Sequence, residues 1–182
     1  MFYIDLQAPN DQQQVQMKLR SYYIEGFIKS LKSAQNEYQA WSKIASDNNI
    51  TSLSKDINSL FSDKELYFTD EGKWYLQKGV DLKCKFIVSS DGSCFMVLQS
   101  DAMTSNEVVA HGYSVGSAFS FLSGRWGLAF GSSTTSIIRY CPGASLVFSS
   151  SEEIDMFIQK IYKAKEWKTN NINQGKLFKA VH

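Results

Sequence analysis

The residues best suited to chemistry form one short motif, residues 112–116, with the sequence Gly-Tyr-Ser-Val-Gly. A serine hydroxyl becomes a nucleophile when a neighbouring base removes its proton, and the base is commonly a histidine oriented by a carboxylate. Beyond Ser114, the available acids are Glu152, Glu153, Asp155 and Glu166, of which we select Asp155, and His182 is the one later histidine. The candidate catalytic set is therefore Ser114, Asp155 and His182.

The motif is similar to the G-x-S-x-G turn of the α/β-hydrolase family, in which the nucleophile lies between a strand and a helix. The resemblance covers about fifteen residues and implies an esterase-like serine hydrolase. The surrounding sequence predicts hairpins, whereas that fold alternates strands and helices. A histidine in a C-terminal tail is also poorly placed to stay within about 3 Å of a hydroxyl. We keep the hydrolase as an alternative and expect a non-catalytic protein.

The segment from Val108 to Ser151 contains no Asp or Glu, and its formal charges are Arg125 and Arg139. Each arginine is followed by an aromatic residue, Trp126 or Tyr140. Tyr, Trp and Arg contribute most of the binding energy at protein interfaces. We predict that these four residues bind a partner protein. The competing interpretation is structural, with the aromatic ring in the core and the arginine extending along it to solvent.

Lysines are interleaved with aromatic residues over 160–179. Lysines can contact the phosphates of a nucleic acid, and aromatic rings can stack on its bases. Among the nearby acidic residues, Glu166 lies within this stretch, and Glu152, Glu153 and Asp155 precede it. A nucleic-acid binder that uses this region is a second alternative. We do not expect nucleic acid as the partner, because a net charge of +1 provides no general attraction to phosphates.

Composition predicts a cytoplasmic protein without cofactor, metal or membrane partner. The N-terminus lacks the basic and apolar regions of an export signal, and no window reaches the roughly 18 apolar residues of a membrane span. Three cysteines, an odd number, fit a reducing compartment. Cys84, Cys94 and Cys141 have no metal-binding spacing, and the chain has two histidines.

The predicted fold is α+β, a single domain of 182 residues in three parts. Apolar residues at steps of three and four predict a helical segment over 10–61, including a short second helix capped by Thr51 or Ser52. A mostly antiparallel sheet is predicted over 66–148, with the N-terminal and C-terminal helices packed on it. A capping box of Ser150 and Glu153 predicts an amphipathic helix over 150–168.

Two turns fix the expected strand pairing. Asp70-Glu71-Gly72 should join two strands, and Asp91-Gly92 should form a two-residue hairpin loop. The second loop would place Val88 opposite Phe95 and Cys84 opposite Gln99. The candidate strands 107–113, 118–122, 125–130, 136–140 and 145–148 are separated by Gly124, residues 131–133 and Pro142-Gly143. Glycines inside these strands suggest bulges or close backbone approach.

The sequence thus predicts a protein that acts by binding another protein. The specific form that we expect is an inhibitor or immunity-type protein like those of bacteria. Such a protein neutralises a toxin or an enzyme by binding over it. The oligomeric state stays open, since an exposed sheet edge could support self-association.

Overall fold

The computed structural model describes residues 2–10, 12–120 and 125–179, and the side chains of these residues except 59, 60, 108–135 and 171–179. It has the predicted α+β fold, with a mostly antiparallel sheet and N-terminal and C-terminal helices. The chain divides into two compact units. We call Met1–Met103 with Cys141–His182 the main unit, and Thr104–Tyr140 the hairpin unit.

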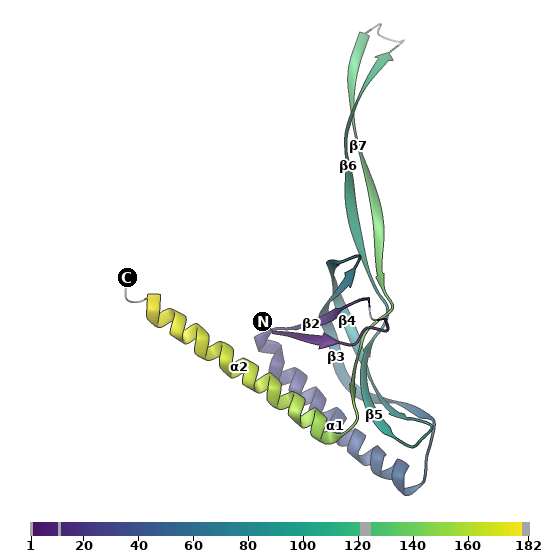
Figure 1. Cartoon of the computed structure of the whole chain (residues 1–182), viewed down its shortest axis with the longest axis vertical. Coiled ribbons are helices and arrows are strands. Elements are labelled where there is room, and N and C mark those ends of the chain that lie inside the picture. The colour runs from purple at the N-terminus through teal and green to yellow at the C-terminus, as the bar shows by residue number, and fades with distance from the viewer. Residues whose placement is uncertain (1, 11, 121–124, 180–182) are drawn as a thin grey trace. The chain divides into compact units, whose positions relative to one another are not determined.

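The main unit contains a six-stranded antiparallel sheet (Figure 1). Its strands, in spatial order, are β1 (Phe2–Leu6), β2 (Val15–Leu19), β3 (Leu53–Asp70), β4 (Lys73–Val88), β5 (Cys94–Ser100) and β8 (Ser145–Phe148). Gln7, which follows β1, and Ser145 in β8 exchange two backbone hydrogen bonds of 2.8 Å each. The outermost strands therefore meet, and the sheet curls back on itself.

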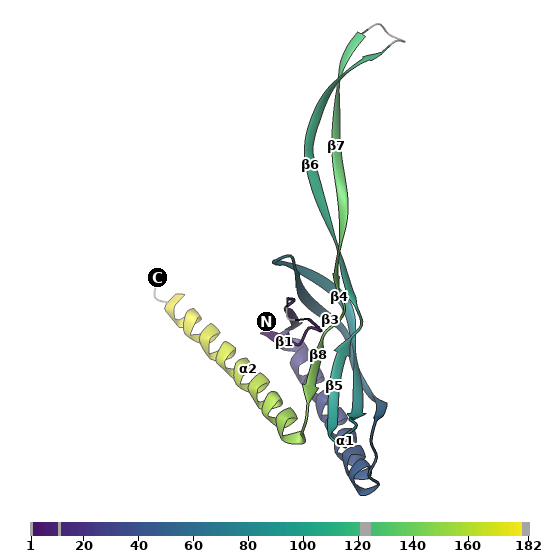
Figure 2. The same cartoon turned by 45° about the vertical axis from the view of Figure 1, so that its right-hand side comes forward.

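The helix α1 (Ile24–Asp47) follows a short 3-10 turn, Ser21–Tyr23, and lies along the inner face of the curled sheet (Figure 2). Its apolar stripe packs into the core, where Phe27 contacts Phe61 at a ring-centroid distance of 5.5 Å. Tyr38 and Trp41 both pack edge-on against Phe86 of β4. The apolar stripe of α1 is therefore part of the hydrophobic core of this chain.

The helical prediction for 10–61 is wrong at both ends, because Val15–Leu19 and Leu53–Asp70 are strands. Val15, Met17 and Leu19 are at most 1% exposed, and the residues between them lie on the other face. That pattern has the two-residue period of a strand, but the spacing from Val15 to Leu19 also suits a helix. The predicted short second helix is likewise replaced by the pairing of β3 with β4.

The turn at Asp70 is confirmed, since Asp70 pairs with Lys73 across Glu71 and Gly72, both with positive φ. The register predicted for β4 and β5 is wrong by one residue. Val88 pairs with Cys94, and Cys84 pairs with Leu98.

The register changes because the chain forms a five-residue connection over 89–93. Ser89 donates its backbone N–H to the Ser93 carbonyl, and the Asp91 carboxylate accepts the N–H of Ser93 at 2.9 Å. All three cysteines are free, with Cys84 and Cys141 buried.

The hairpin unit is formed by the long strands β6 (Met103–Ser120) and β7 (Arg125–Cys141), which pair as a separate two-stranded sheet. The shorter strands predicted in this region are therefore continuous, and the glycines within them do not end the strands.

The C-terminal helix α2 (Ser151–Lys179) begins as the capping box predicts. Glu153 donates its backbone N–H to the Ser150 hydroxyl, and its carboxylate accepts the N–H of Ser149 at 2.7 Å. That last bond lowers the pKa of Glu153. The helix runs past the predicted end at 168, because the Asn-rich residues 170–175 contain no proline and continue the helical backbone. In the described parts of the chain, neither long helix has an apolar stretch sufficient to cross a lipid bilayer.

Gly143 occupies a position that only glycine suits, with φ of +126° and a Cβ position 2.9 Å from the Ser100 carbonyl oxygen. We expect Gly143→Ala to lower the unfolding free energy by about 1–3 kcal/mol, because a non-glycine residue is strained there. Gly26→Ala is the matched control: nothing lies within 4 Å of its Cβ position on α1, and alanine favours a helix by about 0.5–1 kcal/mol. Urea unfolding of both variants checks the prediction, and equal stability of Gly143→Ala and wild type would contradict it.

Candidate functional site

A group of polar and aromatic side chains lies on the outer face of β1, β2 and β3, opposite the core. The strand register places Tyr3 beside Lys18, and Lys18 beside Glu65. Because Met17 and Leu19 of β2 point into the core, Lys18 between them must lie on the outer face.

Glu65 is the electrostatic centre of this group. Its carboxylate forms an ion pair with the Lys18 ammonium at 2.6 Å and accepts a hydrogen bond from the Arg20 guanidinium. The hydrogen bond from Lys18, followed by that from Arg20, lowers the pKa of Glu65, and the same contact raises the pKa of Lys18. Arg20 also donates to the Tyr22 hydroxyl at 3.1 Å. The Glu65 carboxylate therefore restrains the side chains of Lys18 and Arg20, and through Arg20 it also restrains Tyr22.

Tyrosine rings surround these charges. Tyr3 packs edge-on against Tyr67 at 5.9 Å between centroids, and the Lys18 ammonium lies 5.8 Å from the centre of the Tyr67 ring. Tyr22 contacts Tyr23 at 4.2 Å between centroids. We call this group the tyrosine–arginine surface; it consists of Tyr3, Lys18, Arg20, Tyr22, Tyr23, Glu65 and Tyr67.

The tyrosine–arginine surface is accessible to a partner. Tyr22 is 65% exposed, Tyr3 51% and Tyr23 48%. A hollow of about 190 Å³ lies beside it, lined by Lys18, Arg20, Tyr23 and Glu65 with Asp63, Lys64 and Lys78. Burial lowers the pKa of Lys64, and its ammonium donates to the Ser62 carbonyl at 2.7 Å.

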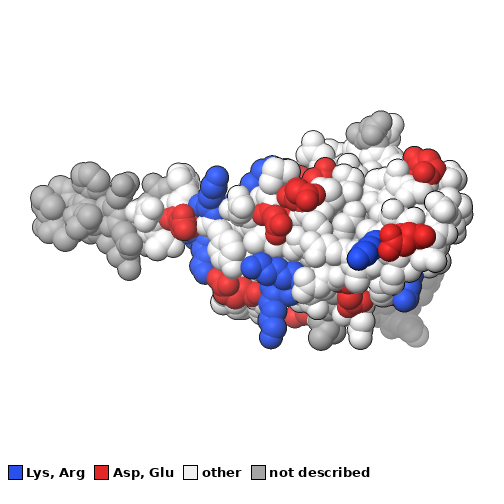
Figure 3. Space-filling model, turned by 90° about the horizontal axis from the view of Figure 1, so that it is seen from below, with Lys and Arg blue, Asp and Glu red and all other residues white. Residues whose placement is uncertain are grey.

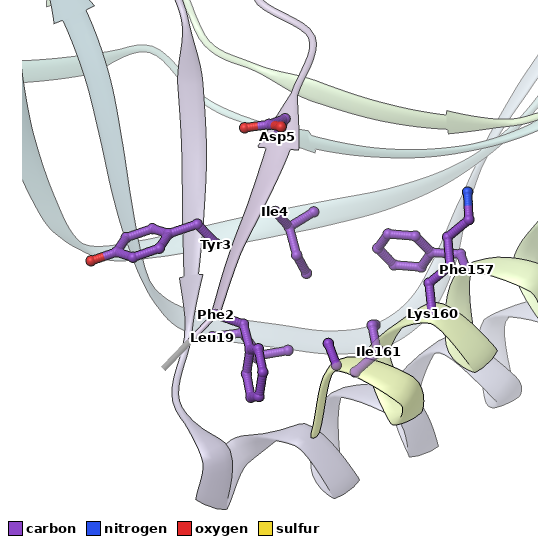
Figure 4. A pocket seen from close by; sticks show the side chains of 9 residues that line it. Phe2, Tyr3, Ile4, Asp5, Leu19, Phe157, Lys160 and Ile161 are labelled. Atoms are coloured by element: carbon purple, nitrogen blue, oxygen red, sulfur yellow. The ribbon is translucent and has the colours of Figure 1, made fainter. Parts of the chain in front are cut away.

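A second feature of the main unit is an apolar cavity of about 380 Å³ between β1 and α2 (Figure 4). Phe2 and Ile4 face it from the strand, and Phe157 and Ile161 face it from the helix, whereas the side chain of Tyr3 points away. Ligand pockets are also lined mainly by apolar side chains, with a small number of polar groups that orient the occupant. The polar residues in this lining are Tyr3, whose side chain points away, Asp5 and Lys160, and we interpret the cavity as a gap in packing between two elements.

The predicted catalytic set is not brought together among described side chains. Asp155 is exposed in the first turns of α2. The backbone of Ser114 belongs to β6, but its side chain lies outside the described residues, as does the whole of His182. The hydrolase alternative is therefore neither supported nor tested by this geometry.

The predicted partner-binding residues all belong to the hairpin unit, and the side chains of Arg125 and Trp126 lie outside the described residues. Arg139 is 7% exposed and donates to one Glu107 oxygen from Nε at 2.9 Å and from Nη2 at 2.8 Å. Tyr140 is 53% exposed. Partner binding by these residues stays a prediction.

The lysines of α2 with described contacts bind within the main unit. Lys165 pairs with Glu25 of α1 at 2.5 Å, and Lys168 donates to the Ser21 hydroxyl at 3.1 Å. On the face shown in Figure 3, cationic and anionic side chains are interspersed. This arrangement does not favour a continuous phosphate-binding track.

Within the described residues, no group of three or more His, Cys, Asp or Glu side chains could hold a metal ion. Burial raises the pKa of the Cys84 thiol to about 12, so this cysteine is a core residue and a poor nucleophile.

Searches against protein-family models, curated proteins and solved structures found no match to this chain. The tyrosine–arginine surface is not predicted from the sequence, because the apolar spacing of Val15–Leu19 suits a helix as well as a strand. An alternating pattern there would have placed Gln16 and Lys18 on one exposed face.

Glu65→Gln should remove the charge that orders the surface. A carboxyl whose pKa is lowered by folding stabilises the folded state above its ordinary pKa of 4.5, and this contribution is lost as the pH falls further. The difference in unfolding free energy between wild type and Glu65→Gln should therefore be largest above that value and shrink below it. Urea unfolding across this range measures it, with the exposed Glu166→Gln as control. A difference that stays constant from about pH 6 to about pH 3 would refute the assignment.

Ala164→Leu should fill part of the apolar cavity, because Ala164 lines it from α2. We expect the unfolding free energy to rise by about 0.5–2 kcal/mol. The control is Ala40→Leu, the same change at an exposed position of α1, which should alter stability by no more than about 0.5 kcal/mol. Thermal and urea unfolding compare the two, and a destabilised Ala164→Leu would show that the space is not available to a side chain.

Proposed function

We propose that this protein is non-catalytic and acts by binding another protein through the tyrosine–arginine surface. The observation that supports this most directly is the arrangement of Arg20 and Tyr22. Arg20 is held at once by Glu65 and by the hydroxyl of Tyr22, and the Tyr22 ring is 65% exposed. Arginine and tyrosine are the residue types that most often provide the largest binding energies at protein interfaces.

Preorganisation adds to this argument. Ordering a long side chain on binding costs about 0.5–1.5 kcal/mol. The Arg20 contacts to Glu65 and Tyr22 restrict its side chain before a partner arrives, and the Tyr3 ring is positioned by its contact with Tyr67. More of the contact energy is therefore retained as affinity.

Charge indicates the chemistry of the partner. Among the side chains that line the adjoining hollow, four are cationic (Lys18, Arg20, Lys64, Lys78) and two are anionic (Asp63, Glu65). A partner that presents carboxylates would be electrostatically complementary to this region. We therefore infer an acidic patch on the partner protein.

An inhibitor or immunity-type role is the specific form that we propose, in which this surface covers an acidic cleft of a toxin or another enzyme. Such a role requires a rigid surface and no reacting groups of its own, and the ion-paired strands β1–β3 provide rigidity. We propose the cytoplasm as its compartment, since the three cysteines are free.

Arg20→Ala and Tyr22→Ala test the proposal, with Lys83→Ala as the matched control. Lys83 is an exposed cation that is ion-paired with Asp101 at 2.7 Å and is not part of the surface. Immobilised wild type and variants would be incubated with lysate of the source cell, and the partner purified. Calorimetry should then show affinity reduced by about 2 kcal/mol, roughly 30-fold, for the surface variants and unchanged for Lys83→Ala. A partner bound equally by all four proteins would overturn the proposal.

A further inference from the structure

The hairpin unit has strands whose outer edges are unpaired within the described structure. β6 and β7 contain 18 and 17 residues and form a sheet with each other alone. At about 3.4 Å per residue, an 18-residue strand extends about 60 Å. A two-stranded hairpin is at best marginally stable in water and gains stability from a third strand or a packed face. A third strand paired to an edge of this hairpin would therefore stabilise it.

The sequence of these strands lacks the residues that normally block edge pairing. Natural edge strands are protected by lysine, proline, inward-pointing charge or bulges. Between Glu107 and Arg139 the sequence has no lysine, no proline and no acidic residue, and Arg125 is its one formal charge. Nothing in this composition opposes pairing with a further strand.

The described end of the hairpin unit supports the same conclusion. Glu107 and Arg139 neutralise each other through two hydrogen bonds to one carboxylate oxygen. Ile138 is 69% exposed and Tyr140 is 53% exposed, and as alternate residues of β7 they lie on one face. The hairpin unit therefore presents apolar surface beside an ion pair that leaves no net charge.

We propose that a second copy of this chain supplies the missing strand, with β6 of one copy pairing antiparallel to β6 of the other about a two-fold axis. A lipid surface cannot supply the hydrogen bonds that a strand edge requires. The same strand of another copy matches the edge in length. β6 is the edge that we assign, because its one formal charge, Glu107, is neutralised by Arg139 and its stretch 108–120 carries none, whereas β7 also carries Arg125. Pairing about a two-fold axis places the same stretch on both sides of the contact, so no like charges meet within it.

This inference is independent of the proposed function, because it concerns the hairpin unit and not the tyrosine–arginine surface. Either proposal can fail while the other stands. A dimer formed through β6 would present two copies of the tyrosine–arginine surface in one assembly.

Light scattering of the full chain after gel filtration, over a range of protein concentrations, tests the dimer. Wild type should have twice the 20.6 kDa mass of the chain. Ser114→Lys places a charge at the midpoint of the uncharged stretch 108–120 and should give a single-chain mass. Ser54→Lys is the matched control, since Ser54 is exposed on β3 of the main unit, and it should remain a dimer.

Hydrogen exchange of wild type provides a measurement that does not depend on a variant. The backbone amides of β6 should exchange more slowly as protein concentration rises, because pairing protects them. A wild type of 20.6 kDa with exchange independent of concentration would overturn the proposal. It would also be overturned if β6 became protected only on addition of phosphatidylcholine vesicles while the protein in solution stayed a single chain.

Discussion

The packing of α1 against the inner face of the curled sheet is the interaction on which the main unit depends. Ile24, Leu31 and Ala34 of α1 are fully buried, as are Met17 and Leu66 of the adjacent strands. Full burial of one large aliphatic side chain contributes about 1.5–3 kcal/mol. The curled sheet closes where its outermost strands meet at Gln7 and Ser145, and apolar side chains of β1–β5 and β8 converge with those of α1 on one core.

The tyrosine–arginine surface follows from that core. Side chains along a strand point alternately to its two faces. Because the apolar residues of β2 and β3 face α1, Lys18, Glu65 and Tyr67 lie on the opposite face. The register then determines which of them meet, and a shift of one residue would exchange the two faces. Hydrophobic packing therefore determines which charged side chains meet in the tyrosine–arginine surface. This surface is rigid because the core holds its strands in place.

The two units are stabilised in different ways. The main unit buries its own apolar side chains, and its ion pairs lie at the surface, as between Lys83 and Asp101. The hairpin unit depends on backbone pairing between two long strands and, among the described side chains, on the Glu107–Arg139 pair. The surface that we propose for partner binding therefore belongs to the main unit, and the strand edge that we propose for self-association belongs to the hairpin unit.

Local signals in the sequence determined the elements that need only neighbouring residues. The capping box at Ser150 and Glu153 and the turn at Glu71 and Gly72 were predicted correctly, since capping and turn geometry are set within a few residues. The α+β class followed from the succession of a helical stripe, hairpins and a C-terminal amphipathic helix. Tertiary structure decided the rest. Apolar residues four apart, such as Val15 and Leu19, suit a helix face and a strand face equally, and it is pairing with β1 and β3 that selects the strand. The contacts of Glu65 with Lys18 and Arg20 join residues more than 40 positions apart, so their meeting depends on a register that no local pattern encodes.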